Sequence, residues 1–119
     1  MDVKALILRT KRHPAYDQVG MMLCHNGVVR GTSRDGRQVT GLRVIVDQKR
    51  LAAVLAEQRA RPGIVDIQVE IAADTDLSVG DDVMLLLVAG DIRENVIAVL
   101  TDTLNAIKTT VTAKTEFFV

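Results

Sequence analysis

The sequence predicts an α+β fold, with helices packed on a largely antiparallel sheet or partial barrel. Its 119 residues fall within the usual length of one domain. Hydrophobic residues make up 48% of the chain and prolines number only two, so a packed core is expected. Helix-like and strand-like periodicities follow one another without a repeat or linker. We therefore interpret residues 1–119 as a single domain.

Three segments have the periodicity of amphipathic helices, in which apolar residues recur every three or four positions. They are residues 3–13, 48–61 and 91–110. Pro14 ends the first, while Asp47 can cap the second and Pro62-Gly63 ends it. In the third, Asp91 and Glu94 have the spacing of a capping box, which would satisfy free N–H groups of the first turn.

Five segments are predicted to be strands: residues 21–30, 39–46, 65–71, 83–89 and 114–118. Asp35-Gly36 suits a tight turn, so the first two strands are expected to form an antiparallel hairpin. The third alternates strictly between apolar and polar residues, which predicts one water-exposed face. The fourth follows a turn at Gly80-Asp81 and is apolar throughout, which predicts a partner of the third strand that is covered on both faces.

Composition argues against several classes of function. Basic and acidic residues number 15 each, so no overall field attracts nucleic acid or an anionic membrane. Aromatic residues are 3% of the chain, too few for base stacking. No apolar run approaches the roughly 20 residues that span a bilayer, and we see no signal peptide. A nucleic-acid-binding domain built on the arginines near residue 34 is therefore disfavoured.

Cys24 is the only cysteine, and no paired Cys/His spacing indicates a metal site. We therefore predict no internal disulfide, no metal and no cofactor. A lone thiol fits a reducing compartment, so we expect a cytoplasmic protein.

Two basic residues of the last helix lie where apolar residues are expected. Arg93 falls on the side of Leu100 and Leu104, in a first turn whose dipole favours anions. It can bind an anionic ligand or pair with a nearby carboxylate such as Glu94. Lys108 falls at the edge of the same stripe. Its stem can carry the amine to water, or a partly dry pocket can favour the neutral, nucleophilic amine.

A third group surrounds the predicted hairpin. Gly27 and Gly31 flank Arg30 at a strand end, and Arg34 and Arg37 follow. Glycine lets a ligand approach the backbone, and guanidinium forks suit phosphate or carboxylate. Arginines at a hairpin tip are also commonly solvated. Nearby, His25 has no nucleophile at a recognisable spacing, so we interpret it as a hydrogen-bonded structural residue.

Taken together, these positions resemble the family of the large, catalytic subunit of molybdopterin synthase. The resemblance runs from about Met21 to Phe118 and rests on five segments in the family's order. They are Gly27-Val28-Val29-Arg30, Val79-Gly80-Asp81-Asp82, Ile92-Arg93, Ile107-Lys108 and Lys114-Thr115-Glu116.

The resemblance implies a sulfur transfer reaction. The donor would be a small ubiquitin-like carrier subunit with a thiocarboxylate on its glycine-glycine tail. The acceptor would be cyclic pyranopterin monophosphate, which becomes the dithiolene of molybdopterin. Lys108 and Lys114 match the family's catalytic lysines, and Arg30 and Arg93, with Gly27, match its substrate-binding positions. The resemblance also implies a homodimer that forms a heterotetramer with the carrier.

The chain departs from the family pattern at several positions. Ile92 stands in place of a histidine, residues 71–74 replace a histidine-arginine segment, and the segment between the two lysines is one residue shorter. These departures leave an alternative in which the protein binds the carrier or another phosphorylated ligand without catalysis.

Overall fold

The computed structural model describes all residues from 1 to 119 and contains three α-helices and six strands. The helices are α1 (Val3–Lys11), α2 (Gln48–Arg59) and α3 (Arg93–Ala106). The strands are β1 (Met21–Val28), β2 (Val39–Val46), β3 (Ile64–Ile71), β4 (Asp76–Ser78), β5 (Asp82–Gly90) and β6 (Thr112–Phe118). A short 3-10 helix, η1 (Tyr16–Gln18), precedes β1, and a π-helical turn, η2 (Ile107–Val111), joins α3 to β6.

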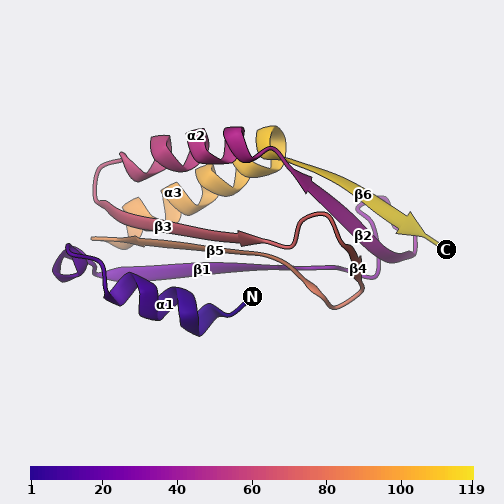
Figure 1. The fold of residues 1–119 in the computed structure, drawn as a ribbon, viewed down its shortest axis with the longest axis horizontal. Coiled ribbons are helices and arrows are strands. Elements are labelled where there is room, and N and C mark those ends of the chain that lie inside the picture. The colour runs from indigo at the N-terminus through magenta and orange to yellow at the C-terminus, as the bar shows by residue number, and fades with distance from the viewer.

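The strands form two three-stranded antiparallel sheets with the orders β1-β5-β3 and β4-β2-β6. Figure 1 shows α2 and α3 on one face of the first sheet and α1 on the other, with the second sheet at one end of the molecule. The predicted α+β class with antiparallel sheets is confirmed, and neither sheet closes into a barrel. No helix is long and apolar enough to cross a membrane.

The core is built on β5, whose side chains are buried from Met84 to Ala89. Leu85, Leu87 and Ala89 pack with Leu6 of α1. The residues of β5 that alternate with these point to the opposite face of the sheet, where they pack with side chains from α2, α3 and β3. The predictions that this strand pairs with β3 and is covered on both faces are both confirmed.

The predicted hairpin between the first two strands is wrong. β1 pairs with β5, while β2 lies in the other sheet between β4 and β6. The turn itself forms, because Gly36 has a φ of 87° and Thr32 bridges Gln38. After β1, however, Val29 N–H donates to the Asp81 carbonyl, which keeps this chain segment beside the start of β5. Turn chemistry acts locally and does not decide which strands pair beyond the turn.

The predicted water-exposed face of β3 is also wrong, because α1 covers it. Gln68 is only 6% exposed, and its amide donates to the Leu6 carbonyl at 3.0 Å and to Thr10 Oγ1 at 2.5 Å. Glu70, on the same face, lies 3.9 Å from Arg9 of α1. The polar side chains of this face therefore contact a helix that is distant in sequence.

The helix starts were predicted with mixed success. Asp47 caps α2 as predicted, accepting from Arg50 N–H at 3.0 Å. The predicted capping box of α3 is wrong, because the N-cap residue is Ile92 rather than Asp91 and the helix begins at Arg93. The Asp91 carboxylate instead accepts from the Asn95 amide and from Ile92 N–H, and these hydrogen bonds lower the pKa of Asp91.

Two leucines of α1 provide a test of its contribution to the core. Leu6 is fully buried and Leu8 is 44% exposed on the same helix. Leu6→Ala should lower the free energy of unfolding by about 2–5 kcal/mol, because it leaves a cavity against β5. Leu8→Ala should cost less than about 1 kcal/mol. Urea unfolding followed by circular dichroism measures both, and equal losses would contradict the packing of α1 on the sheet.

Candidate functional site

A pocket of about 260 Å³ lies between η2, β6, the loop before β2 and the ends of β3 and β5. Its apolar wall comes from three strands, β2, β3 and β5. Its basic side chains come from the loop, η2 and β6. The complete lining is Arg34, Val44, Ile71, Val83, Met84, Lys108, Thr112 and Lys114. The pocket thus has an apolar wall with basic groups beside it, and such a cavity is suited to an anionic ligand with an apolar part.

Lys108 and Lys114, the two predicted catalytic residues, both line this pocket. Lys108 is exposed, so the structure agrees with the alternative in which its stem carries the amine to water. The Lys114 side chain is 55% exposed, and its Nζ lies 3.9 Å from Glu116 Oε1. An ion pair at this distance and exposure is weak, so it leaves Lys114 available to a ligand.

The π-helical turn η2 brings the two lysines to one pocket. Ile107 and Val111, at its two ends, are buried, whereas Lys108 between them is exposed. Asp47 N–H donates to the Val111 carbonyl at 2.8 Å, which fixes the end of the turn against the start of α2. The next residue, Thr112, already belongs to β6. The chain therefore passes from helix to strand within the short segment between the lysines. π turns are rare and often found at functional sites.

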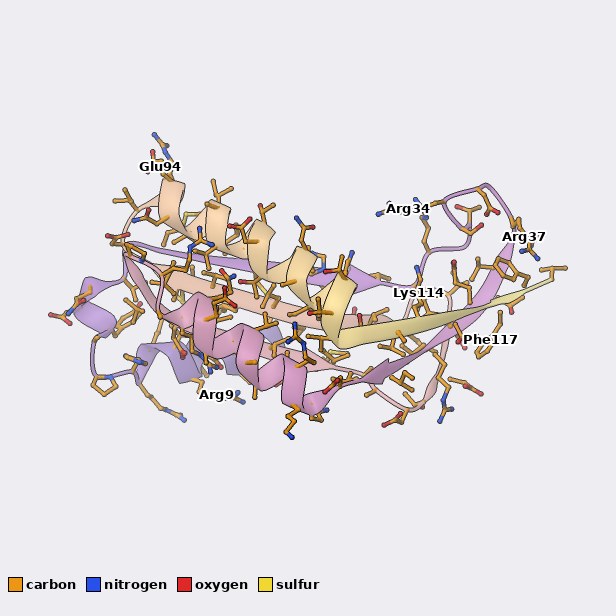
Figure 2. All side chains as sticks on the ribbon, turned by 90° about the horizontal axis from the view of Figure 1, so that it is seen from above. Arg9, Arg34, Arg37, Glu94, Lys114 and Phe117 are labelled. Carbon is orange, nitrogen blue, oxygen red and sulfur yellow. The ribbon has the colours of Figure 1, made fainter.

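Arg34 is the third basic residue of the pocket. It lies on the loop of residues 29–38, and Figure 2 shows it at the same end of the molecule as Lys114. Of the three arginines in this region, the family resemblance singles out Arg30 for substrate binding. Arg30 does not line the pocket, and its Nε donates to the Thr32 carbonyl at 2.8 Å. Arg37 lies over the Phe118 ring, 3.6 Å from its centroid.

Arg93 is not brought to the pocket within one chain. Its side chain is 78% exposed, and its Nε lies 3.4 Å from Glu94 Oε1. The prediction that it lies on the buried stripe is therefore wrong, and the alternative of a carboxylate neighbour is confirmed. The helix rise places Arg93 about 20 Å from Lys108. Figure 2 accordingly shows Glu94 and Lys114 towards opposite ends of the molecule.

Gly27 and His25 lie together on β1. A Cβ atom on Gly27 would come within 3.2 Å of His25 Nε2, so the glycine leaves room for the imidazole. Gly27 also pairs with Met84, which lines the pocket. Burial, followed by the charge of Lys108, lowers the His25 pKa. The sequence predicts a hydrogen bond for the His25 side chain, but the imidazole has no hydrogen-bond partner in the chain, and only the His25 carbonyl accepts, from Cys24 Sγ. In the other histidine, by contrast, His13 Nδ1 accepts from Ala15 N–H.

The chain contains no cluster of three or more His, Cys, Asp or Glu side chains that could hold a metal ion. The sequence gives no indication of a chemical role for His25, because no nucleophile lies at a recognisable spacing from it. The effect of the Lys108 charge on His25 cannot be inferred from sequence spacing, because the two residues belong to η2 and β1.

Comparison with known families gives a match to the MoaE protein family over residues 1–110. The chain belongs to the MoaE protein family. The resemblance to large subunits of molybdopterin synthase is thereby confirmed, and membership of this family associates the chain with molybdenum cofactor biosynthesis. The comparison with curated proteins gave no match.

Solved structures share the MoaE fold. The molybdopterin cofactor biosynthesis protein E of Burkholderia multivorans is 23% identical with a TM-score of 0.78, and the match covers 100% of this chain and 84% of that one. Molybdopterin synthase from Staphylococcus aureus is 20% identical with a TM-score of 0.73, covering 87% and 77% of the two chains. A complex of subunits 1 and 2 of the molybdopterin-converting factor from Helicobacter pylori is 15% identical with a TM-score of 0.71, covering 99% and 84%.

The proximity of His25 to Lys108 predicts a measurable titration. The His25 pKa in the folded chain should lie below the ordinary value of 6.5, and Lys108→Ala should raise it by removing a nearby positive charge. NMR of the imidazole signals measures both, with His25→Asn used to assign the signal. Lys4→Ala, on α1 across the sheet, should leave the His25 pKa unchanged.

The lowered His25 pKa also makes the free energy of unfolding depend on pH. Because the unfolded chain binds the His25 proton more readily, the contribution of neutral His25 is present above its unfolded pKa and is lost as pH falls below it. A His25 pKa at or above the ordinary value would contradict the burial of the imidazole beside Lys108.

Proposed function

We propose that this protein transfers sulfur from the thiocarboxylated tail of a small ubiquitin-like carrier to cyclic pyranopterin monophosphate, forming molybdopterin. The observation on which the proposal depends is that Lys108 and Lys114 line one pocket. These are the two lysines that the family resemblance singles out as catalytic. Membership of the MoaE family supports the same assignment.

The pocket offers suitable electrostatics for this reaction. A thiocarboxylate is an anion, so two lysines and an arginine attract it and stabilise charge that develops during transfer. The apolar side chains of Val44, Ile71 and Val83 line the same cavity. They exclude part of the solvent and so strengthen these interactions. A volume of about 260 Å³ is at the small end of ligand pockets, which suits a narrow diglycine tail and the reacting end of a substrate.

A separate carrier subunit is part of this proposal. The Helicobacter pylori relative is a complex of two subunits of the molybdopterin-converting factor, which supports a small-subunit partner for this chain. We also propose a homodimer, and hence a heterotetramer with two carriers. Arg93 lies too far from Lys108 to share a ligand within one chain, so its predicted role in substrate binding requires a second copy. Arg30 and Gly27 are proposed to shape the approach to the pocket, since both belong to the segment leading from β1.

A non-catalytic role is the second candidate, and Ile92 favours it. The family's histidine is replaced here by an apolar side chain that is 52% exposed and cannot carry a proton. In this alternative the protein binds the carrier or another phosphorylated ligand but does not transfer sulfur.

Sulfur transfer can be tested by mixing the protein with thiocarboxylated carrier and cyclic pyranopterin monophosphate and measuring dithiolene product. Lys108→Ala and Lys114→Ala should each lower the rate by about 10²-fold, because each removes a positive group near the reacting atoms. Lys4→Ala, on the far face of the sheet, is the matched control and should retain the wild-type rate. Circular dichroism verifies that the variants are folded.

The outcomes separate the two candidate functions. Full activity in the Lys108/Lys114 double variant would refute their assignment. Carrier binding by the wild-type protein without any product would favour the non-catalytic alternative.

A further inference from the structure

The loop of residues 29–38 is a hydrogen-bonded platform beside the pocket. Ser33 is 7% exposed, and its N–H donates to the Arg37 carbonyl at 2.9 Å. Its hydroxyl bonds the Asp35 carboxylate and accepts from Arg37 N–H. Gly36 N–H donates to the Ser33 carbonyl at 3.0 Å, closing the turn. The backbone that carries Arg34 is thus held by its neighbours before any ligand binds, which reduces the entropic cost of binding.

The three arginines of this loop have different surroundings. Arg30 Nε is occupied by the Thr32 carbonyl, and Arg37 is stacked on Phe118. Arg34 lines the pocket together with Lys108 and Lys114, and it takes part in none of the six side-chain ion pairs of the chain. Its guanidinium is therefore the one that remains available to a ligand in the pocket.

The carboxylate next to Arg34 in sequence is already engaged. A hydrogen bond from the Ser33 hydroxyl, with smaller contributions that include the charge of Arg37, lowers the Asp35 pKa. Glu116, a carboxylate of β6, lies beside Lys114. Neither forms an ion pair with Arg34 that would compete with an external anion.

We propose that Arg34 is the phosphate-binding arginine of this pocket and selects a ligand that carries a phosphate ester. A guanidinium fork donates two parallel bonds to two oxygens of one phosphate, whereas a lysine amine acts as a point charge. Arg34 then supplies, from the same chain as the two lysines, the contact that Arg93 cannot make there. The identification of the ligand with the sulfur acceptor rests on the proposed function.

Phosphate and carboxylate share the chemistry that a guanidinium recognises, so the experiment treats them separately. Phenyl phosphate is titrated into the isotope-labelled protein in one series, and a peptide ending in a Gly-Gly carboxylate in another, with affinities taken from amide NMR shifts. Arg34→Ala should weaken phenyl phosphate binding about tenfold or more. Arg34→Lys should retain part of the affinity, because it keeps the charge and loses the fork.

Arg37→Ala is the matched control, because Arg37 belongs to the same loop and does not line the pocket. It should change phenyl phosphate affinity by less than about twofold, since the Arg37 guanidinium is stacked on Phe118 and makes no contact in the pocket. Unchanged affinity in Arg34→Ala, or an equal loss in Arg37→Ala, would overturn the proposal. So would a loss confined to the Gly-Gly peptide, because it would assign Arg34 to the carrier tail instead.

This binding test is independent of sulfur transfer. If wild-type protein yields no dithiolene but Arg34→Ala loses phosphate affinity, the phosphate site stands and the proposed reaction fails. If dithiolene forms but phosphate binding does not depend on Arg34, the reaction stands and the assignment of Arg34 fails.

Discussion

Burial of β5 on both faces is the constraint on which the other elements depend. This strand pairs with β1 along one edge and β3 along the other, and α1 packs on one face while α2 and α3 cover the opposite one. Fully burying one aliphatic side chain contributes about 1.5–3 kcal/mol. Leu85, Leu86 and Leu87 are consecutive and essentially inaccessible to solvent, so the run stabilises both layers at once.

The same strand determines where the pocket forms. Val83 and Met84, near the start of β5, contribute to the pocket wall. Because α3 packs along β5, its final turn is carried toward that end of the sheet, where η2 leads into β6. β6 then leaves to pair with β2 in the other sheet. The pocket thus lies where the two sheets meet. The chain turns sharply from η2 into β6, and Lys108 lies before this turn and Lys114 after it.

Features that depend on local chemistry could be predicted from the sequence, and features that depend on distant elements could not. The apolar run of β5 and the cap at Asp47 were predicted correctly, because each is specified by adjacent residues. The alternation of β3 predicted its strand but not its covering, since the helix that bonds Gln68 lies 62 positions earlier in the chain. The turn at Gly36 similarly could not reveal that β1 and β2 belong to different sheets.

The basic residues show the same limit at the level of the site. Helical spacing relates Arg93 to the apolar side chains of α3, but it does not account for the exposure of the first turn of that helix. Among the three arginines of one loop, the family resemblance favours Arg30, and only the fold shows that Arg34 lines the pocket while Arg37 is stacked on Phe118. A chain with zero net charge therefore gathers Arg34, Lys108 and Lys114 around one cavity, and of these three only Lys114 has a carboxylate partner, Glu116. Binding of an anion would reduce the mutual repulsion among these three cations. The positive charge of the pocket therefore favours an anionic ligand, because the chain itself does not neutralise it.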